Sequence, residues 1–427
     1  MAAHTIEQLS ETIARTSAQL SLGLKSQGFA SPTVNDVVKG PNFEAINVKA
    51  SRELLDAAYE LEALVLGPSK MLSLMAFIYH DISSLGALLE FNIPGLIPLD
   101  GTATIAELAL KSSLSEDKLT RFIRYATTNF IFREPSPGVV AHTAISAAMV
   151  RDPKFCAFLL FVTVNCANAE ISIPAACKKW PQSEKLSECA VNEAYGTNDT
   201  FFQWLSKDAE RQDRFDRGMA GLSGNDNGLA GRPQQLDIEI YPWVEKLGPK
   251  AVVVDVGGGS GHISRVLAHT YPEFTVTVQD HPKAISAAKS DPDLPPNLSY
   301  QEHDFFSPQP LHGGDVYLFR KVFHNWPRTE AVSIIRALVP ALKPGARVLV
   351  SEFLMPGAER GESLLEDKLV RQMDLQMMGA FNSKERTAKE YAALFQEADE
   401  RLKYQAKYQF PGDQKSCIFE AVWEGDS

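Results

Sequence analysis

The sequence predicts an α/β protein in which a mainly helical first part precedes a Rossmann-like second part. Three observations support this fold class. The apolar run Val252–Val256 has the β-branched composition of a buried parallel strand, and it ends in the glycine-rich turn 257–261. Residues 262–269, which follow the turn, form an amphipathic segment. β-patterned and helical stretches then alternate to the C-terminus, whereas residues before 245 carry mainly helical periodicity.

The N-terminal part is predicted to be helical and strongly apolar. Residues 1–25 have apolar side chains at helical spacing, and residues 26–50 are expected to form a linker. Helical periodicity resumes at Ser51, and Pro68 opens a further apolar segment over residues 71–89. Such a wide apolar stripe predicts helices that pack into a core or against a partner subunit.

Residues 101–145 carry a winged-helix pattern. Thr104 and Glu107 form a capping box ahead of a short helix, and Ser115 precedes a longer one. A hairpin with a Pro-Gly turn is expected over residues 130–142. The pattern raises a DNA-binding hypothesis. The net charge of −11 and the position ahead of a nucleotide-binding domain favour a structural or dimerisation role instead.

Composition excludes several classes of site. The hydrophobic content of 44% and charged content of 22% are usual for a soluble globular protein. The five cysteines lack paired C-x-x-C spacing, so we expect no zinc site or disulfide framework and a reducing compartment. We expect no signal peptide and no membrane span, because the apolar run 157–164 is short enough for a buried helix. These features predict a cytoplasmic protein without a nucleic-acid or membrane partner.

Residues 150–245 are expected to be mostly helical, with a loop at residues 224–228. Phe201 and Phe202 are assigned to ordinary core packing. Met219 lies near the expected domain junction, so a pocket wall and a core position fit it equally well.

The second part is predicted to continue with further strands and helices after Val256. The expected strands are residues 274–280, a strand near Tyr300, residues 315–319 and residues 347–354, with a helix at 330–342 and a terminal hairpin formed by 402–410 and 416–423.

Three residues in this part predict a site for an adenosine-containing ligand. Asp280 ends the second strand nineteen residues beyond Gly261, where a carboxylate can accept two hydrogen bonds from a ribose diol. Asp304 and Phe305 follow the third strand. An acceptor for an adenine amino group beside a stacking aromatic ring suits that position, although the pair also fits a simple turn.

His324 is the strongest candidate for a catalytic group. It follows a strand at its carboxyl end, where open α/β sheets place reactive groups. Glu352 lies on the next strand, and Glu385 lies in a later loop. An imidazole that has one nitrogen held by a carboxylate leaves its other nitrogen free to take a proton near neutral pH.

The chain resembles the class I S-adenosylmethionine-dependent O-methyltransferases of the plant caffeate type, and its insertions are similar to those of fungal secondary-metabolism members. The resemblance runs from roughly residue 55 to the end. It rests on five motifs that occur in order: Asp255-Val-Gly-Gly-Gly-Ser-Gly261, Gln279-Asp-His-Pro282, His303-Asp-Phe-Phe, Phe319-Arg-Lys-Val-Phe-His-Asn-Trp and Lys384-Glu-Arg-Thr.

This resemblance implies a seven-stranded methyltransferase domain and a winged-helix dimerisation domain. The expected division is an N-terminal extension at 1–50, a dimerisation domain at 51–245 and a catalytic domain at 246–427. S-adenosylmethionine is the implied cofactor, with no metal, and a homodimer acting on a phenolic or polyketide-type small molecule is the implied assembly.

The resemblance also assigns roles to single residues. It implies that His324 is the general base and that Glu352 and Glu385 flank it. The implied cofactor-binding residues are Gly257, Gly259, Asp280, Asp304, Phe305 and Arg320. The implied acceptor-binding residues are Met219 and Met377.

Other functions are open on the same sequence. Some fungal proteins of this fold bind the same cofactor but act as pericyclases, and a leporin-type member carries arginine at the position of the histidine. The presence of His324 and both glutamates favours methyl transfer, while residues 201–205 and 308–310 match the pericyclase subgroup. A non-catalytic binding protein would be expected to lack part of the histidine–glutamate set. An NAD-dependent reductase fits the terminal hairpin and the segment 384–387 poorly.

Overall fold

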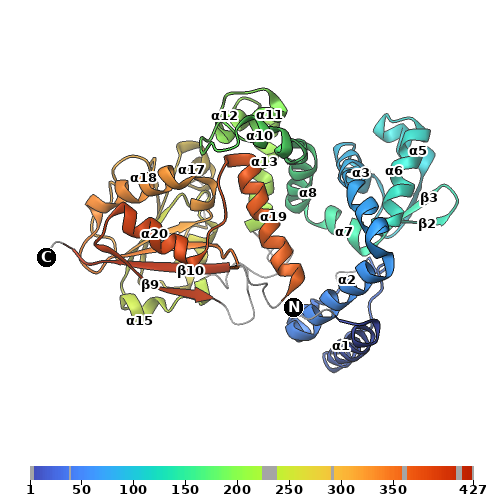
Figure 1. Ribbon diagram of the computed structural model, residues 1–427, viewed down its shortest axis with the longest axis horizontal. Helices are drawn as coiled ribbons and strands as arrows, with labels where there is room; N and C mark the ends of the chain where they lie inside the picture. Colours follow the sequence, from blue (N-terminus) through green and yellow to red (C-terminus); the bar gives the residue numbers. More distant parts are fainter. Residues whose placement is uncertain are drawn as a thin grey trace. The chain divides into compact units, whose positions relative to one another are not determined.

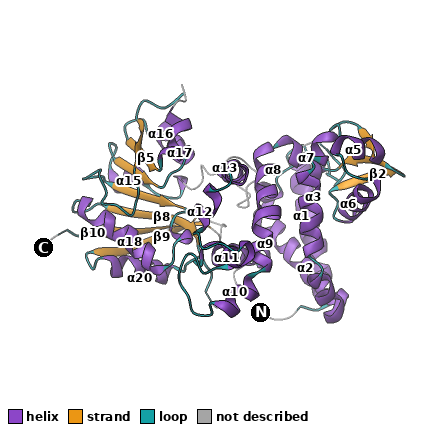
Figure 2. Cartoon of the chain, turned by 90° about the horizontal axis from the view of Figure 1, so that it is seen from above, coloured by secondary structure: helices purple, strands orange, loops and turns teal. Residues whose placement is uncertain are grey.

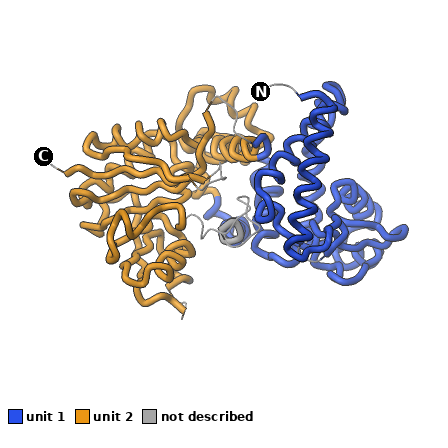
Figure 3. Tube along the Cα trace, turned by 90° about the horizontal axis from the view of Figure 1, so that it is seen from below, with its two compact units in different colours: residues 1–168, 205–222, 363–365 blue, residues 169–204, 223–362, 366–427 orange. Residues whose placement is uncertain are grey.

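The computed structural model describes residues 4–37, 40–223, 238–289, 293–357, 363–409 and 416–425 (Figure 1). They form two compact units, coloured separately in Figure 3. Unit 1 comprises residues 1–168, 205–222 and 363–365, and unit 2 comprises residues 169–204, 223–362 and 366–427. The three-part division expected from the sequence stays a prediction.

Unit 1 opens with two long helices that pack against each other, α1 (Ile6–Ser26) and α2 (Phe43–Ala76). α2 begins inside the predicted linker, so that prediction is wrong for residues 43–50, where the helix is interrupted at Asn47. The reason is an N-cap: the Asn42 side chain accepts hydrogen bonds from the first helical N–H groups. Gly67 has a φ of 70°, and Pro68 follows it, so α2 is kinked where the sequence predicts a new segment.

The winged-helix pattern is present in unit 1. The capping box of Thr104 and Glu107 starts its first helix, the Ser115 side chain caps its second, and Gly138 at a φ of 79° closes the hairpin. The elements are α5 (Ile105–Ser112), α6 (Glu116–Thr128) and an antiparallel sheet of order β1-β3-β2, formed by Thr102–Thr104, Val139–His142 and Phe132–Ser136.

Further helices account for most of the remaining chain before residue 224. They are α3 (Tyr79–Glu90), α4 (Ile93–Leu96), α7 (Ala144–Arg151), α8 (Pro153–Leu160), a π-helical turn (Phe161–Cys166), α9 (Ala167–Ile171), α10 (Ile173–Lys179), α11 (Ala190–Tyr195), α12 (Phe201–Ser206) and α13 (Ala209–Ser223).

One helical run is longer than the sequence predicts. α8, the π-helical turn and α9 are continuous from Pro153 to Ile171, and this run is long and apolar enough to cross a membrane by length and composition alone. The bent pair α2 and α3 passes the same test as one broken span. The expectation that no segment reaches this length is therefore wrong. Core helices of globular proteins have the same properties, so the finding does not define a membrane segment.

Unit 2 is built on a seven-stranded sheet of order β6-β5-β4-β7-β8-β10-β9, which Figure 2 shows with helices on both faces. The first five strands in this order are parallel, and β10 is antiparallel to both of its neighbours. β4 lies between β5 and β7, so the chain order reverses there, and ligands of open α/β sheets bind at such a point. The strands are β4 (Val252–Val256), β5 (Thr275–Asp280), β6 (Leu298–Glu302), β7 (Val316–Arg320), β8 (Arg347–Phe353), β9 (Leu402–Gln409) and β10 (Ser416–Trp423).

Alternate strand residues feed a separate core on each face of this sheet. Val254 and Tyr317 pack on one face with α18 and α20, and Val253 and Leu318 pack on the other with α16. The helices of unit 2 that follow β4 or precede it closely are α15 (Trp243–Leu247), α16 (His262–Thr270), α17 (Pro282–Lys289), the 3₁₀ turn η2 (Phe323–Asn325), α18 (Arg328–Leu338), the 3₁₀ turn η3 (Val339–Ala341), α19 (Leu364–Phe381) and α20 (Ala388–Ala398).

The expected strands and the terminal hairpin are confirmed, with two differences. Val252 is 38% exposed, so the first residue of β4 is not buried. The helix expected to reach residue 342 ends at Leu338 and continues as a 3₁₀ turn, because Pro340 has no N–H to donate. The expected loop at 224–228 and the hairpin loop at 411–413 lie outside the described residues.

Candidate active site

The glycine-rich turn leaves the carboxyl end of β4 and crosses the end of β5. The Gly257 N–H donates to the Gln279 carbonyl at 2.8 Å, and the Gly259 N–H donates to Asp280 Oδ2 at 2.8 Å. Both glycines have positive φ, 75° and 58°, which glycine adopts without strain. A Cβ at Gly257 would come within 2.9 Å of Val322, whereas a Cβ at Gly259 would meet no atom within 4 Å. The turn is therefore tightly packed at Gly257 and has open space at Gly259.

Asp255 supports this turn from within. It is 2% exposed, and its Oδ2 accepts a hydrogen bond from the Ser264 hydroxyl at 2.6 Å. Burial raises the pKa of Asp255 to about 6, against the effect of that hydrogen bond and of the positive charge on Arg320. The positive charge of Arg320, a predicted cofactor-binding residue, therefore acts on the Asp255 carboxyl group.

The two predicted adenosine-binding carboxylates lie at the carboxyl ends of neighbouring strands. Asp280 ends β5, and its carboxylate accepts the N–H groups of Gly259 and His281. Asp304 follows β6, is exposed, and accepts the Phe306 N–H at 3.0 Å. The last contact is that of a turn, so the structural role considered for Asp304 is present, and its exposed carboxylate still has acceptor capacity.

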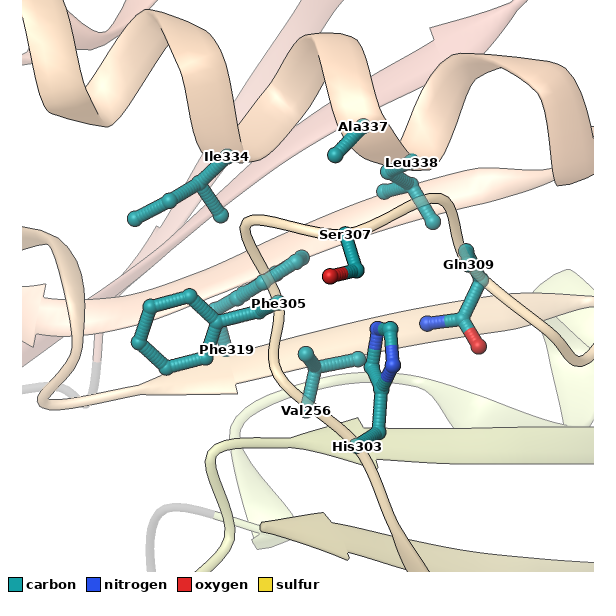
Figure 4. A pocket seen from close by; sticks show the side chains of 9 residues that line it. All are labelled: Val256, His303, Phe305, Ser307, Gln309, Phe319, Ile334, Ala337 and Leu338. Atoms are coloured by element: carbon teal, nitrogen blue, oxygen red, sulfur yellow. The ribbon is translucent and has the colours of Figure 1, made fainter. Parts of the chain in front are cut away.

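Phe305 is held from behind by packing. Figure 4 shows a small recess at this turn, where Phe305, Ser307 and Gln309 lie opposite Ile334 and Leu338 of α18. The recess has no room for a water molecule, so it is a packing contact and not a ligand site. It fixes the ring that is expected to stack on a ligand.

These features fit an adenosine-type cofactor. The open position above Gly259 leaves the backbone accessible, and Asp280 offers a carboxylate at the same loop. Asp304 and Phe305 offer an acceptor and an aromatic face on the adjoining strand end. A ribose diol and a purine ring require this set of groups.

His324 lies in η2, the 3₁₀ turn that follows β7. The imidazole is 12% exposed, and the side chains of Glu352 on β8 and Glu385 after α19 are fully buried beside it. His324 Nδ1 lies 2.8 Å from Glu385 Oε1 and 3.6 Å from Glu352 Oε2. Glu352 Oε1 also accepts the His324 backbone N–H at 3.4 Å. The three residues that the sequence singled out are brought together.

The geometry fixes which imidazole nitrogen can act. Both carboxylates face Nδ1, so we assign the proton of the neutral ring to Nδ1, and Nε2 keeps its lone pair. Burial disfavours the imidazolium, but the charges of Glu352 and Glu385 outweigh it and raise the pKa of His324 above its ordinary value. Burial raises the pKa of Glu352. The imidazolium that forms when Nε2 takes a proton is therefore stabilised by the two carboxylates.

The same three groups have a second chemical possibility. Each offers one metal-ligand atom, and these atoms lie within 4.8 Å of one another. A divalent cation there would compete with the Nδ1 proton. The sequence predicts no metal, and assays with and without a chelator separate the two cases.

Three further residues were missed as site residues: Asp374 and Arg386 contact Glu385 or the His324 turn, and the positive charge of Lys321 acts on His324. Asp374 of α19 accepts the Glu385 N–H at 2.8 Å, and no sequence signal marks it. Arg386 donates to two backbone carbonyls of the His324 turn. Its position next to Glu385 in the Lys384-Glu-Arg-Thr motif could have marked it. Lys321 has a φ of 54° and places its ammonium 3.3 Å from the centre of the Phe353 ring.

Aromatic rings of unit 2 lie beside the cluster. The rings of Trp326 and Phe305 are in edge contact. The ring centre of Phe202 lies 6.2 Å from that of Trp326 and 5.4 Å from that of Phe381. Phe201 is buried as expected, but Phe202 is 37% exposed, so the assignment of Phe202 to the core is wrong.

The two predicted acceptor-binding methionines lie on different helices. Met377 is buried in α19, within unit 2, and Met219 is partly buried in α13, within unit 1. Their contact with an acceptor stays a prediction.

This combination of features is typical of a nucleotide-cofactor enzyme: a sheet of this order, a glycine turn with open space for a ligand, and a histidine held by carboxylates. Comparison with known proteins narrows this class. The O-methyltransferase domain family matches residues 178–399. A chlorophenol O-methyltransferase of Trichoderma longibrachiatum is 34% identical, over 97% of this chain and 90% of its own length. The O-methyltransferase VdtC of Byssochlamys spectabilis is 34% identical, over 88% and 87%.

Solved structures share the fold at lower identity. OxaC in complex with S-adenosylhomocysteine and oxaline has a TM-score of 0.76 at 22% identity, over 97% of this chain and 100% of its own. LepI in complex with S-adenosylmethionine has a TM-score of 0.77 at 21% identity, over 97% and 99%. The chain belongs to the O-methyltransferase family, whose members are enzymes that use S-adenosylmethionine.

Proposed function

We propose that this enzyme methylates a hydroxyl of a phenolic or polyketide-type small molecule, with His324 as the general base. The observation that carries the proposal is the 2.8 Å contact between His324 Nδ1 and Glu385, because it leaves Nε2 as the proton acceptor. A phenol is a poor nucleophile until it loses its proton, so a base within hydrogen-bond reach is what this reaction requires.

The chain's residues divide the work between binding and proton transfer. S-adenosylmethionine supplies an electrophilic methyl group that needs only in-line placement of a nucleophile. Its adenosine part would be held by Gly257, Gly259 and Asp280, and its adenine ring by Asp304 and Phe305. His324 Nε2 takes the hydroxyl proton, and the negative charges of Glu352 and Glu385 stabilise the resulting imidazolium.

The acceptor class rests on the aromatic surroundings of the base and on the relatives. Trp326 and the partly exposed Phe202 give a flat, apolar environment within unit 2. The name of the Trichoderma relative describes action on a chlorophenol. Both favour a planar phenolic ring, with Met377 of α19 as a further contact.

We also propose a homodimer formed through unit 1. Val65, Leu72 and Met75 of α2, and Phe77 and Ile78 after it, are each more than half exposed. Apolar patches of this kind mark protein interfaces.

A matched pair of variants tests the function. Purified protein with labelled methyl donor and a panel of phenols and pyridones, assayed with a chelator present, should give labelled product. His324→Ala should bind S-adenosylhomocysteine as the wild type does in calorimetry, with turnover lowered about 10²- to 10⁴-fold. Asp280→Asn should show the reverse pattern, with cofactor affinity lost and the base intact.

Three outcomes would overturn the proposal. Retention of most turnover by His324→Ala would remove the base assignment. Cyclised product without label would favour a pericyclase, the class to which one structural neighbour with a TM-score of 0.75, a pericyclic reaction enzyme, belongs. Loss of activity in chelator, restored by a divalent cation, would assign the His324 cluster to a metal.

A further inference from the structure

We infer that Arg386 is a positioning residue that clamps the backbone of the His324 turn and thereby holds the imidazole against Glu385. Arg386 Nη1 donates to the Phe323 carbonyl at 2.7 Å, and Nη2 donates to the Trp326 carbonyl at 2.6 Å. These carbonyls belong to the residues on either side of His324 and Asn325. The inference rests on the proposed function, because it concerns the proposed base.

The turn has little of its own to hold it. η2 spans three residues, and its internal hydrogen bonds are Asn325 N–H to Val322 at 3.1 Å and Trp326 N–H to Phe323 at 3.1 Å. Short 3₁₀ turns have poor hydrogen-bond geometry and leave their last carbonyls without helical partners. The Trp326 carbonyl is such a group, and Arg386 supplies its donor.

The backbone of Arg386 is itself anchored at two places, against the residues that follow β8 and at the start of α20. Its backbone forms a parallel bridge with Leu354 at the end of β8, and its carbonyl accepts the Met355 N–H at 3.1 Å. The next residue, Thr387, is the N-cap of α20 and forms a capping box with Glu390. The guanidinium therefore extends from a fixed backbone toward the turn.

The chemistry of the side chain fits a clamp better than a packing role. Arg386 is 2% exposed, and among the described residues no carboxylate forms an ion pair with it. A buried guanidinium is retained where its rigid, planar set of donors is needed. Here it binds two carbonyls at once, which lysine cannot do with the same geometry.

With this clamp, each of residues 384–387 has a defined contact. Lys384 pairs with Glu390, Glu385 binds the imidazole, Arg386 binds the backbone around it, and Thr387 starts α20. Two consecutive residues thus hold the His324 side chain and the backbone carbonyls of Phe323 and Trp326 on either side of it.

Arg386→Lys is the test variant, because it keeps the charge and loses the paired donors. Arg336→Lys is the matched control, since Arg336 also donates to two backbone carbonyls, those of Glu397 and Ala398, which do not belong to the His324 turn. We expect Arg386→Lys to lower kcat about 10- to 100-fold, as a misplaced catalytic group does. S-adenosylhomocysteine affinity should stay within about twofold of the wild type, and the control should match the wild type in both.

A direct readout separates positioning from general stability. NMR titration of the histidine imidazoles in the resting protein, with His324→Ala used for assignment, gives the pKa of His324 without any substrate. Loss of the Glu385 contact in Arg386→Lys should lower that pKa, and the acid limb of the kcat profile should move to lower pH with it.

The outcomes are distinguishable from failure of the proposed function. If His324→Ala is fully active, the proposed function fails, and the NMR titration still tests the clamp. If His324→Ala is inactive but Arg386→Lys keeps kcat and the pKa of His324, the clamp alone is overturned. An Arg386→Lys protein that does not fold, or that loses kcat with an unchanged His324 pKa, assigns Arg386 to domain stability and also overturns it.

Discussion

His324 is controlled through one nitrogen. Both glutamates approach Nδ1, so they set the tautomer, the ring orientation and the charge of the imidazole together. Glu385 is itself fixed by Asp374, which accepts its backbone N–H. A base held in this way takes a proton at Nε2 without first having to reorient.

The pH dependence of turnover follows from this arrangement. As the proposed base, His324 must be neutral to accept a proton, so we expect kcat to rise with pH through the pKa of His324, which the glutamates raise. Glu385→Gln keeps a hydrogen-bond acceptor at Nδ1 and removes one negative charge. We expect the acid limb of the kcat profile to move down by about 1–2 pH units, and kcat at neutral pH to fall about 10- to 100-fold.

Glu352→Gln is the matched control for this measurement. Its carboxylate lies farther from Nδ1, at 3.6 Å, and should give a smaller shift in the same direction. An acid limb that stays in place in Glu385→Gln would show that another group controls the profile.

The predicted and missed residues of the site differ in kind. His324, Glu352 and Glu385 follow from residue type and from the resemblance, because their side chains carry the chemistry. Asp374 binds a backbone N–H, and Arg386 binds backbone carbonyls. Backbone partners depend on which loops the fold brings together, and a single sequence does not contain that information.

At the scale of elements, α9 and α19 meet through a half-buried carboxyl group, that of Glu170. Glu170 Oε1 accepts a hydrogen bond from Gln376 Nε2 at 3.0 Å, and a Cβ at Gly379 would collide with the same carboxylate. Burial raises the pKa of Glu170 to about 7. The contact is therefore formed by a carboxyl group that is largely protonated in mildly acidic solution.

This shift makes the stability of the protein depend on pH. Between about pH 4.5 and 7 the unfolded chain loses the Glu170 proton while the folded chain keeps it, so the free energy of unfolding falls as pH rises. Glu170→Gln cannot ionise and should remove this contribution. At pH 8 we expect it to stabilise the protein by on the order of 2 kcal/mol, with little effect at pH 4.5.

Denaturant unfolding at the two pH values measures this difference. Glu193→Gln, a partly exposed glutamate paired with Lys179 on the neighbouring α10, serves as the control and should show no such pH dependence. Equal effects of Glu170→Gln at pH 4.5 and pH 8 would contradict the raised pKa.

Element type was predictable where the pattern is long and repetitive. β4, β5, β7, β8 and the terminal hairpin follow from β-branched runs and turn residues. Such patterns did not predict the start of α2 or the continuous helical run Pro153–Ile171. The first depends on one capping side chain, and the second on a π-helical turn that joins two short helices without a break.

At the scale of the whole molecule, the sequence predicts a partner that a single chain cannot display. The apolar excess around Pro68 was visible in the sequence as a stripe too wide for a lone surface helix. In the structure it corresponds to exposed side chains on α2, of which Val65 is 71% and Leu72 is 66% exposed. Exposed apolar side chains that are concentrated on one helix mark a protein interface.

We expect the partner at this interface to be a second copy of the chain. Light scattering after gel filtration should give twice the chain mass of 47.0 kDa for the wild type at micromolar concentration. The double variant Val65→Asp with Leu72→Asp places two charges in the proposed interface and should give 47.0 kDa. Lys111→Asp, at an exposed position of α5, should leave the dimer intact. A wild-type mass of 47.0 kDa would contradict the proposed dimer, because an obligate interface of this apolar type does not dissociate at such concentrations.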